Sequence, residues 1–278
     1  MRYIRMSLRF LKHNALRLLL SAAIASLLLA FVVDLTGMFR FVRFVSDPET
    51  HSFGQIIRTV FGIVSPWWPA GVFCMVVFSA IPQSDLLGTI HRRMTFGDVQ
   101  PFSLRYLWNK INNYFLPILQ ISALFCGIML LDGFLLAVFC YLWAKLSTVV
   151  AIVLSLITGV ILIGIAVLAV SLVLTMLPNM TIKGYGFAMA FRISVTACSK
   201  KLHSIFISVA LPVLVAFIPV SLIGILDFPG AFLLRYLISA LFLFAMHLYI
   251  VPLMYVVFYD TEEMDRQDDE SLEWGRED

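Results

Sequence analysis

The side chains that could do chemistry are few in this sequence, and they form no known catalytic pattern. There is no His-Glu-x-x-His pair of zinc ligands, no Gly-x-Ser-x-Gly turn around a nucleophilic serine and no glycine-rich loop for a nucleotide phosphate. The histidines are dispersed, at His13, His51, His91, His203 and His247. The sequence therefore predicts a protein that is not an enzyme and that has no catalytic, cofactor-binding or metal-binding residues.

Charged groups inside a membrane are costly and usually functional, so any such group is the next candidate. Apart from tyrosines, His247 is the only titratable side chain well inside an expected crossing. A hydrogen bond between helices is its favoured role, with a proton relay as the alternative. The other charges near apolar segments fall at expected helix ends, at Asp34, Asp132, Lys145 and Asp227. The lack of a carboxylate inside a crossing disfavours proton-coupled transport but leaves facilitated or lipid transport open.

Cysteines and prolines indicate little further chemistry. The cysteines are scattered without a Cys-x-x-Cys pair, at Cys74, Cys126, Cys140 and Cys198, so neither a disulfide framework nor a metal site is expected. Prolines lie inside expected crossings at Pro117, Pro212, Pro219 and Pro252. They could break helices and expose backbone groups to a substrate, but a kink used for helix packing is the favoured interpretation.

Apolar helices must position these residues. Of the 278 residues, 61% are hydrophobic and 13% are charged, whereas a soluble domain has about 25% charged residues. A helix needs about 20 mainly apolar residues to cross the hydrocarbon of a membrane. The sequence therefore predicts one all-α transmembrane domain, residues 1–259, with six transmembrane helices and amphipathic interfacial helices. The crossings are expected at residues 15–33, 66–82, 111–131, 147–176, 204–226 and 234–259.

Positive charge sets the expected direction of these crossings. Loops rich in Lys and Arg stay on the cytoplasmic side, and residues 183–203 contain four basic residues and no acid. With this segment and the expected loop at residues 85–110 inside, cytoplasmic segments hold 15 of the 20 Lys and Arg residues. We therefore expect both termini in the cytoplasm.

Basic amphipathic stretches are expected to lie at the membrane surface before three of the crossings. Residues 1–17 carry basic side chains at helical spacing opposite an apolar row, as in a helix that lies on an anionic leaflet. A cleaved signal peptide is the alternative, although the apolar run continues past the candidate cleavage site. Residues 104–112 and 183–203 have similar faces. Three repeated hairpin units or three independent basic segments would both produce this pattern.

Residues 133–182 are ambiguous, because they contain one charge, Lys145, over a length that would fit two crossings. We expect Asp132 and Gly133 to close the third crossing. Two further crossings would place residues 183–203 outside the cell and reverse every later helix. One crossing, preceded by an apolar external segment at residues 134–144, keeps the basic segment inside and is favoured.

The end of the sequence is acidic, since residues 260–278 hold ten acidic residues and two arginines. We expect a disordered cytoplasmic tail, because the segment is charged and nearly free of aromatic residues. It lacks the fixed glycine and ligand spacing of a calcium loop. The tail could fold back on the basic segments or dock a protein partner. Membrane lipids are the other expected partner, nucleic acid is not expected, and the sequence leaves the oligomeric state open.

Several short motifs resemble a group of uncharacterised bacterial integral membrane proteins. They are Lys183-Gly184-Tyr185 before an amphipathic segment, basic stretches before prolines, and Tyr259-Asp260 at the start of the acidic end. This group is loosely related to the membrane domain of some glycerophosphodiester phosphodiesterases, whose catalytic domain has no counterpart in this chain. The resemblance implies a bacterial inner membrane and no defined activity. We expect a non-catalytic accessory, scaffold or regulatory component of the envelope; the alternative is a transporter or channel for a small or lipid-like solute.

Overall fold

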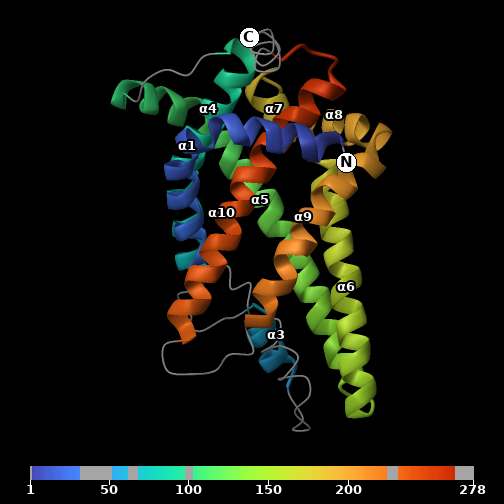
Figure 1. Cartoon of the computed structure of the whole chain (residues 1–278). Helices are drawn as coiled ribbons and strands as arrows, with labels where there is room; N and C mark the ends of the chain where they lie inside the picture. Colours follow the sequence, from blue (N-terminus) through green and yellow to red (C-terminus); the bar gives the residue numbers. More distant parts are fainter. Residues whose placement is uncertain (1, 32–51, 62–67, 98–102, 224–230, 267–278) are drawn as a thin grey trace.

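The computed structural model describes residues 2–31, 52–61, 68–97, 103–223 and 231–266. Every regular element in these ranges is a helix, which confirms the expected all-α class. The helices are α1 (Arg2–Ala30), α3 (Phe53–Phe61), α4 (Trp68–Phe96), α5 (Leu104–Trp143), α6 (Thr148–Leu172), α7 (Met176–Thr181), α8 (Phe187–Lys200), α9 (Leu202–Ile223) and α10 (Ala231–Thr261). Figure 1 shows the long helices running side by side, with α7 and α8 at one end of the bundle and α3 at the other.

Four helical segments are long and apolar enough to cross a membrane. They are Pro69–Phe96, Leu104–Trp143, Val149–Thr181 and Leu233–Thr261. Two further candidates are helix pairs broken by a sharp bend, Arg2–Asn14 with Leu16–Ala30 and Phe187–Lys200 with Leu202–Val215. The chain therefore has the length and composition of a multi-pass membrane protein with four to six spans. The expected count of six requires that each bent pair be one span.

Both bent pairs join an amphipathic helix to an apolar one. The two parts of α1 differ in direction by 105°, and α8 and α9 differ by 95°. A helix that lies on a membrane surface is roughly perpendicular to one that crosses it, so these bends suit the amphipathic faces of residues 1–17 and 183–203. In Figure 1 the first part of α1 lies at the same end of the bundle as α8.

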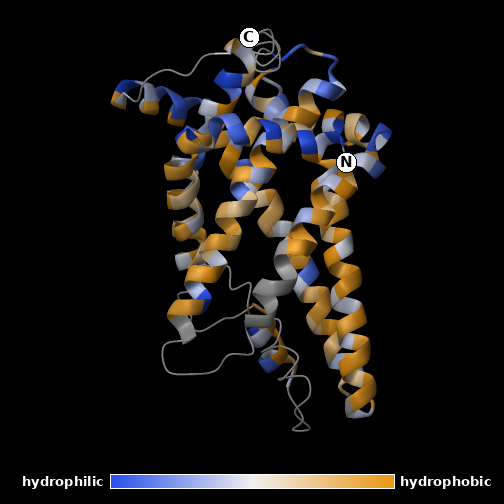
Figure 2. Cartoon of the chain, viewed as in Figure 1, coloured by the Kyte–Doolittle hydropathy of each residue, from blue (hydrophilic) through white to orange (hydrophobic). Residues whose placement is uncertain are grey.

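Hydrophilic residues gather at this end, which we name the basic end. Figure 2 shows polar residues along the first part of α1, on α8 and at the neighbouring helix ends, and apolar residues along the middle of the bundle. The described basic residues on these elements are Arg2, Arg5, Arg9, Lys12, Arg92, Arg93, Arg105, Lys183, Arg192, Lys200 and Lys201. Those near the opposite end are Arg58, Lys145 and Arg235.

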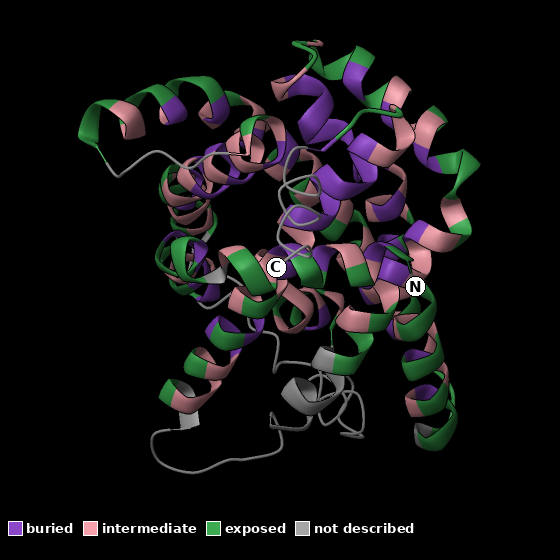
Figure 3. Ribbon diagram, turned by 45° about the horizontal axis from the view of Figure 1, so that its top comes forward, coloured by how far each residue is buried: buried purple, intermediate pink, exposed green. Residues whose placement is uncertain are grey.

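The last part of α10 forms the centre of the molecule near the basic end. Residues 253–259 are buried without interruption, so about two helical turns are covered on every face. α10 packs along α1 and also touches α4, α7 and α9. Figure 3 shows the buried residues gathering where these helices meet. A helix that is apolar all round belongs inside a bundle, and this part of α10 fits that rule.

The second expected crossing, residues 66–82, corresponds to a longer helix. α4 continues past Pro82 to Phe96 and α5 begins at Leu104, so most of the loop expected at residues 85–110 is helical. The sequence-based prediction ends the crossing near Pro82, since proline often interrupts a helix, and starts the loop at Asp85. In the structure α4 runs through both residues to Phe96, and the Asp85 carboxylate is paired with Lys110 of α5.

α5 is also longer than the crossing expected at residues 111–131. It passes without a break through Asp132 and Gly133 to Trp143, and so includes the apolar segment expected as a separate piece at residues 134–144. Gly133 is a packing position and not a helix end, because a Cβ there would lie 2.6 Å from Phe61 Cε1 of α3. A helix of 40 residues is longer than the hydrocarbon thickness, so α5 must extend beyond it.

Candidate functional site

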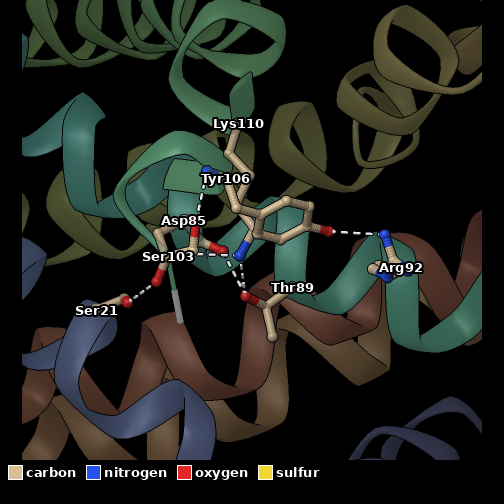
Figure 4. Close-up of polar contacts among 7 residues, drawn as sticks. All are labelled: Ser21, Asp85, Thr89, Arg92, Ser103, Tyr106 and Lys110. Atoms are coloured by element: carbon tan, nitrogen blue, oxygen red, sulfur yellow. Dashed lines mark hydrogen bonds and ion pairs between the residues drawn. The ribbon is translucent and has the colours of Figure 1, made fainter. Parts of the chain in front are cut away.

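A carboxylate and an ammonium group meet between α4 and α5. Asp85 Oδ1 lies 2.7 Å from Lys110 Nζ, and the two side chains are 20% and 10% exposed. Ser21 Oγ of α1 donates a hydrogen bond to Asp85 Oδ2 at 2.5 Å. Lys110 Nζ also donates to Thr89 Oγ1 at 2.8 Å. These contacts, drawn in Figure 4, join three helices.

Helical spacing and one glycine place these groups. Asp85 and Thr89 are four residues apart, so they face the same side of α4. A Cβ at Gly88 would lie 2.8 Å from Lys110 Cγ and 2.9 Å from Lys110 Cδ. Because Gly88 has no side chain, the apolar stem of Lys110 packs directly on α4 while its ammonium group reaches the carboxylate.

Tyr106 completes the surroundings of Lys110. Lys110 Nζ lies 4.7 Å from the centroid of the Tyr106 ring, a distance typical of a cation–π contact. Arg92 Nη1 donates to the Tyr106 hydroxyl at 3.2 Å, and its guanidinium carbon lies 5.6 Å from the centroid of the same ring. We name Ser21, Asp85, Thr89, Tyr106 and Lys110 the Asp85 cluster.

The Asp85 cluster satisfies its own polar groups. Both oxygens of the Asp85 carboxylate accept a hydrogen bond, and the Lys110 ammonium group contacts an acid, a hydroxyl and an aromatic face. The two formal charges cancel. A buried pair of this kind holds helices together, because the loss of either charge leaves the other without compensation.

A second set of polar contacts joins α4 to α5 and α10. His91 Nδ1 is hydrogen-bonded to the Tyr114 hydroxyl, and its ring stacks on Tyr255 with 6.0 Å between centroids. Thr95 Oγ1 and the Tyr259 hydroxyl oxygen are 2.7 Å apart. These contacts connect α4, α5 and α10 through aromatic rings and hydroxyl groups, and none of them is an ion pair.

Asp260 joins three elements at the basic end. Its Oδ1 lies 2.9 Å from Arg2 Nη2 and its Oδ2 lies 2.7 Å from Lys201 Nζ. The Tyr3 hydroxyl donates to Asp260 Oδ2 at 2.6 Å. The carboxylate at the end of α10 thus holds the start of α1 and the bend between α8 and α9. We name these four residues the Asp260 junction.

Buried hydroxyl, thiol and amide groups hold α8 against the end of α6 and against α7. Thr175 Oγ1 lies 2.9 Å from Ser194 Oγ and 3.6 Å from Cys198 Sγ. Asn179 Nδ2 donates to the Thr175 carbonyl at 2.9 Å. In the part of the chain that the structure describes, no three His, Cys, Asp or Glu side chains come together as metal ligands would.

The residues singled out from the sequence are dispersed in the structure. His247 Nδ1 lies 2.9 Å from Ser26 Oγ of α1, so this histidine makes a contact between two helices. Three of the prolines lie within α5, α9 and α10, at Pro117, Pro212 and Pro252. The side chain of Pro219 lies outside the described residues, as do Asp34 and Asp227.

Sequence reasoning misses Asp85 and Lys110 as buried partners, because it places both in a cytoplasmic loop. Asp85 lies within the candidate span Pro69–Phe96, beyond the end near Pro82 that the sequence-based prediction gives to this crossing. The one local signal is that Asp85 and Thr89 are one helical turn apart, beside the polar residues Gln83, Ser84 and His91. Its partner, Lys110, could not be found in this way, because it comes from another helix.

Comparisons with protein-family models, with curated proteins and with solved structures give no match to this chain. The resemblance carried by Lys183-Gly184-Tyr185 and Tyr259-Asp260 therefore stays a prediction. In the structure these residues lie at the basic end. Gly184 has a φ of +68°, a conformation that glycine adopts readily, in the turn between α7 and α8. The geometry of the polar clusters is thus the basis for any functional proposal.

Proposed function

We propose that this protein is a non-catalytic accessory, scaffold or regulatory component of a bacterial inner membrane, and that it acts from its basic end. The observation that carries the proposal is the Asp260 junction, which fastens the first part of α1 and the α8–α9 bend to α10. This fastening couples the surface helices to the buried last part of α10. A docking platform requires such coupling, because a loose surface helix would lose conformational entropy when a partner binds.

The interior of the bundle supports a role without catalysis. Asp85, Lys110 and His91 are engaged with partners on neighbouring helices. A general acid or base must reach the proton that it transfers to or from a substrate. Because these groups make contacts between helices, we propose that they stabilise the arrangement of helices at the basic end.

We also propose that the basic end faces the cytoplasm, with both termini on that side and six crossings in total. Segments rich in Lys and Arg are retained on the cytoplasmic side of a membrane. Among the residues that the structure describes, the basic ones on α1, α8 and the neighbouring helix ends outnumber those near the opposite end, which are Arg58, Lys145 and Arg235.

The acidic residues after α10 are proposed to bind a basic protein partner. Asp260 is engaged in the Asp260 junction, and Glu262 Oε2 lies 3.4 Å from Lys183 Nζ. Glu263 and Asp265 are exposed and are free to attract a partner from solution. Residues 267–278, which complete the acidic segment, lie outside the described residues.

Native mass spectrometry after gentle purification from the native membrane tests the proposal. We expect a stoichiometric protein partner with the wild-type chain. The partner should be lost when the acidic residues of positions 263–278 are replaced by Asn and Gln. Asp132→Asn, which removes an acid from α5 instead, is the control and should retain it. If no protein accompanies the wild-type chain, the accessory role fails.

A transporter or channel for a small or lipid-like solute is the second candidate, and the Asp85 cluster favours it. A carboxylate within a candidate span is a functional candidate by default. Pro82 and Pro117 lie inside the two helices that carry the ion pair, and each removes a backbone donor. Transbilayer movement of a dye-labelled phospholipid in reconstituted vesicles tests this role. Movement that needs the protein and falls with Asp85→Asn would support transport over the accessory role.

A further inference from the structure

Large apolar side chains are exposed where α4 ends and α5 begins, a region that we name the α4–α5 corner. Phe96, Leu104 and Trp108 are 67%, 77% and 71% exposed, although these helix ends lie at the basic end (Figures 1 and 2). Leu104 and Trp108 are four residues apart and share one face of α5. Transfer of each of these side chains out of water would lower the free energy. We therefore expect an apolar environment next to the corner.

Cationic groups border this apolar surface. Arg105 is exposed next to Leu104 and has no carboxylate partner among the residues that the structure describes. The Arg92 guanidinium carbon lies 5.9 Å from the centroid of the Phe96 ring. Aromatic and basic side chains together are typical of the membrane–water interface, where the ring enters the headgroup layer and the cation meets phosphate.

α8 presents the same combination of residues. Its buried stripe, formed by Ala190, Ser194 and Cys198, faces the protein. Its outer surface exposes two phenylalanines one turn apart and two cations, namely Phe187, Phe191, Arg192 and Lys200. No acidic residue occurs on this helix. The 95° bend into α9 is the orientation that a helix on a membrane surface has relative to one that crosses.

A lipid surface explains the position of these groups better than a protein partner does. Leu104 and Trp108 belong to the candidate span Leu104–Trp143, and about two turns further along the same helix Leu116 is 61% exposed. The exposed residues between Trp108 and Leu116 are Asn109, Asn112 and Asn113, polar side chains of the kind that suit the headgroup layer. Arg105 and Arg192 belong to the start of α5 and to α8, two segments at the basic end of the bundle (Figure 1), where the phosphates of a leaflet would lie.

We infer that the α4–α5 corner and α8 form a binding surface for anionic phospholipid headgroups at the basic end. Trp108, Leu104 and the phenylalanines of α8 enter the headgroup layer, while Arg105 and Arg192 bind lipid phosphates. The inference deepens the proposed function, since it names a lipid partner for the same end of the molecule. Its test uses purified protein alone, so it can fail or succeed whether or not a protein partner exists.

Lipid retention in native mass spectrometry tests the role of the cations. The full chain is purified and equilibrated with equal amounts of phosphatidylglycerol and phosphatidylethanolamine. Arg105→Gln with Arg192→Gln should reduce the ratio of bound phosphatidylglycerol to phosphatidylethanolamine by about five-fold per cation. Arg58→Gln with Lys145→Gln removes two exposed cations from the opposite end and should leave the ratio unchanged. An equal fall in both double variants, or in neither, would overturn the inference.

Trp108 supplies a second measurement that does not depend on retention. A full-length variant keeps Trp108 and carries Phe in place of Trp67, Trp68, Trp143 and Trp274. In vesicles, brominated phosphatidylglycerol should quench Trp108 fluorescence more than brominated phosphatidylethanolamine at the same mole fraction. The difference should vanish in Arg105→Gln with Arg192→Gln. Equal quenching by both lipids would exclude recognition of the anionic headgroup, and the absence of quenching would exclude contact with lipid.

Discussion

At the scale of single residues, Lys110 is the side chain whose loss should affect the bundle most directly. Its ammonium group compensates the Asp85 carboxylate within a candidate span. Lys110→Met keeps an unbranched stem of similar size but leaves that carboxylate unpaired. We expect the free energy of unfolding to fall by about 3–5 kcal/mol, because an unpaired buried charge is costly. Unfolding in detergent micelles, followed by circular dichroism, measures this change.

The double variant Asp85→Asn with Lys110→Met is the matched control. It removes both charges and keeps a side chain that can hydrogen-bond Ser21. Most of the lost stability should return, because a neutral pair of similar volume often matches a buried ion pair. Equal destabilisation of the single and the double variant would show that the loss of stability comes from the packing of the Lys110 stem and not from the loss of its charge.

Gly88 is the second residue with a specific expected effect. A Cβ at this position would lie 2.8 Å from Lys110 Cγ and 3.2 Å from Tyr114 Cε2. Gly88→Ala should therefore push α4 and α5 apart and destabilise the protein by about 1–3 kcal/mol. Thermal unfolding of the purified protein measures the loss.

Gly71→Ala in the same helix is the control for this change. No heavy atom lies within 4 Å of a Cβ at Gly71, and alanine has the higher helix propensity. This variant should be neutral or slightly stabilising. A similar loss at both positions would show that contact with Lys110 does not decide the outcome, because alanine favours a helix at either site.

At the scale of helices, the Asp260 junction decides how firmly the surface helices are held. Two of its partners are well exposed, with 71% exposure for the Arg2 side chain and 42% for that of Lys201, so each ion pair alone is weak. Their convergence on one carboxylate, with the Tyr3 hydroxyl, couples three elements. Asp260→Asn should therefore increase amide hydrogen exchange about ten-fold along residues 2–14 and near Lys201, without a comparable change in α6.

Hydrogen exchange followed by mass spectrometry measures this change. Asp265→Asn is the control, because Asp265 is exposed and lies beyond the Asp260 junction. If residues 2–14 exchange at the same rate in Asp260→Asn as in the wild-type chain, the apolar contacts of Phe10 and Tyr3 hold α1 in place by themselves.

At the scale of the whole molecule, the basic end predicts the direction of the chain in its membrane. Ser199 on α8 and Ser147 in the turn before α6 are both exposed and lie on elements at opposite ends of the bundle (Figure 1). In a background without the native cysteines, an impermeant maleimide should label Ser147→Cys on intact cells. It should label Ser199→Cys only after the membrane is permeabilised. The reverse pattern would place the basic end outside.

The sequence by itself determined that the protein is all-α with several long apolar helices, and that its amphipathic segments are basic. Apolar length and helical spacing are properties of consecutive residues, so they predict long apolar helices and basic amphipathic ones without knowledge of the neighbours. The bends beside residues 1–17 and 183–203 follow from the change between these two patterns. The contact of His247 with another helix was also predicted, from its place in an apolar stretch, and its Nδ1 lies 2.9 Å from Ser26 Oγ of α1.

The tertiary structure alone decided where helices end and which charges meet. Asp85 and Lys110 are 25 positions apart, and Tyr3 and Asp260 are 257 positions apart. A local pattern holds no information on such pairs, because the partner comes from another helix. Gly133 shows the same effect. The sequence-based prediction ends a helix at this residue, but in the structure Gly133 packs closely against the Phe61 ring of α3. Local sequence shows that a polar group or a glycine is present, and the fold decides whether it meets water, lipid or a partner.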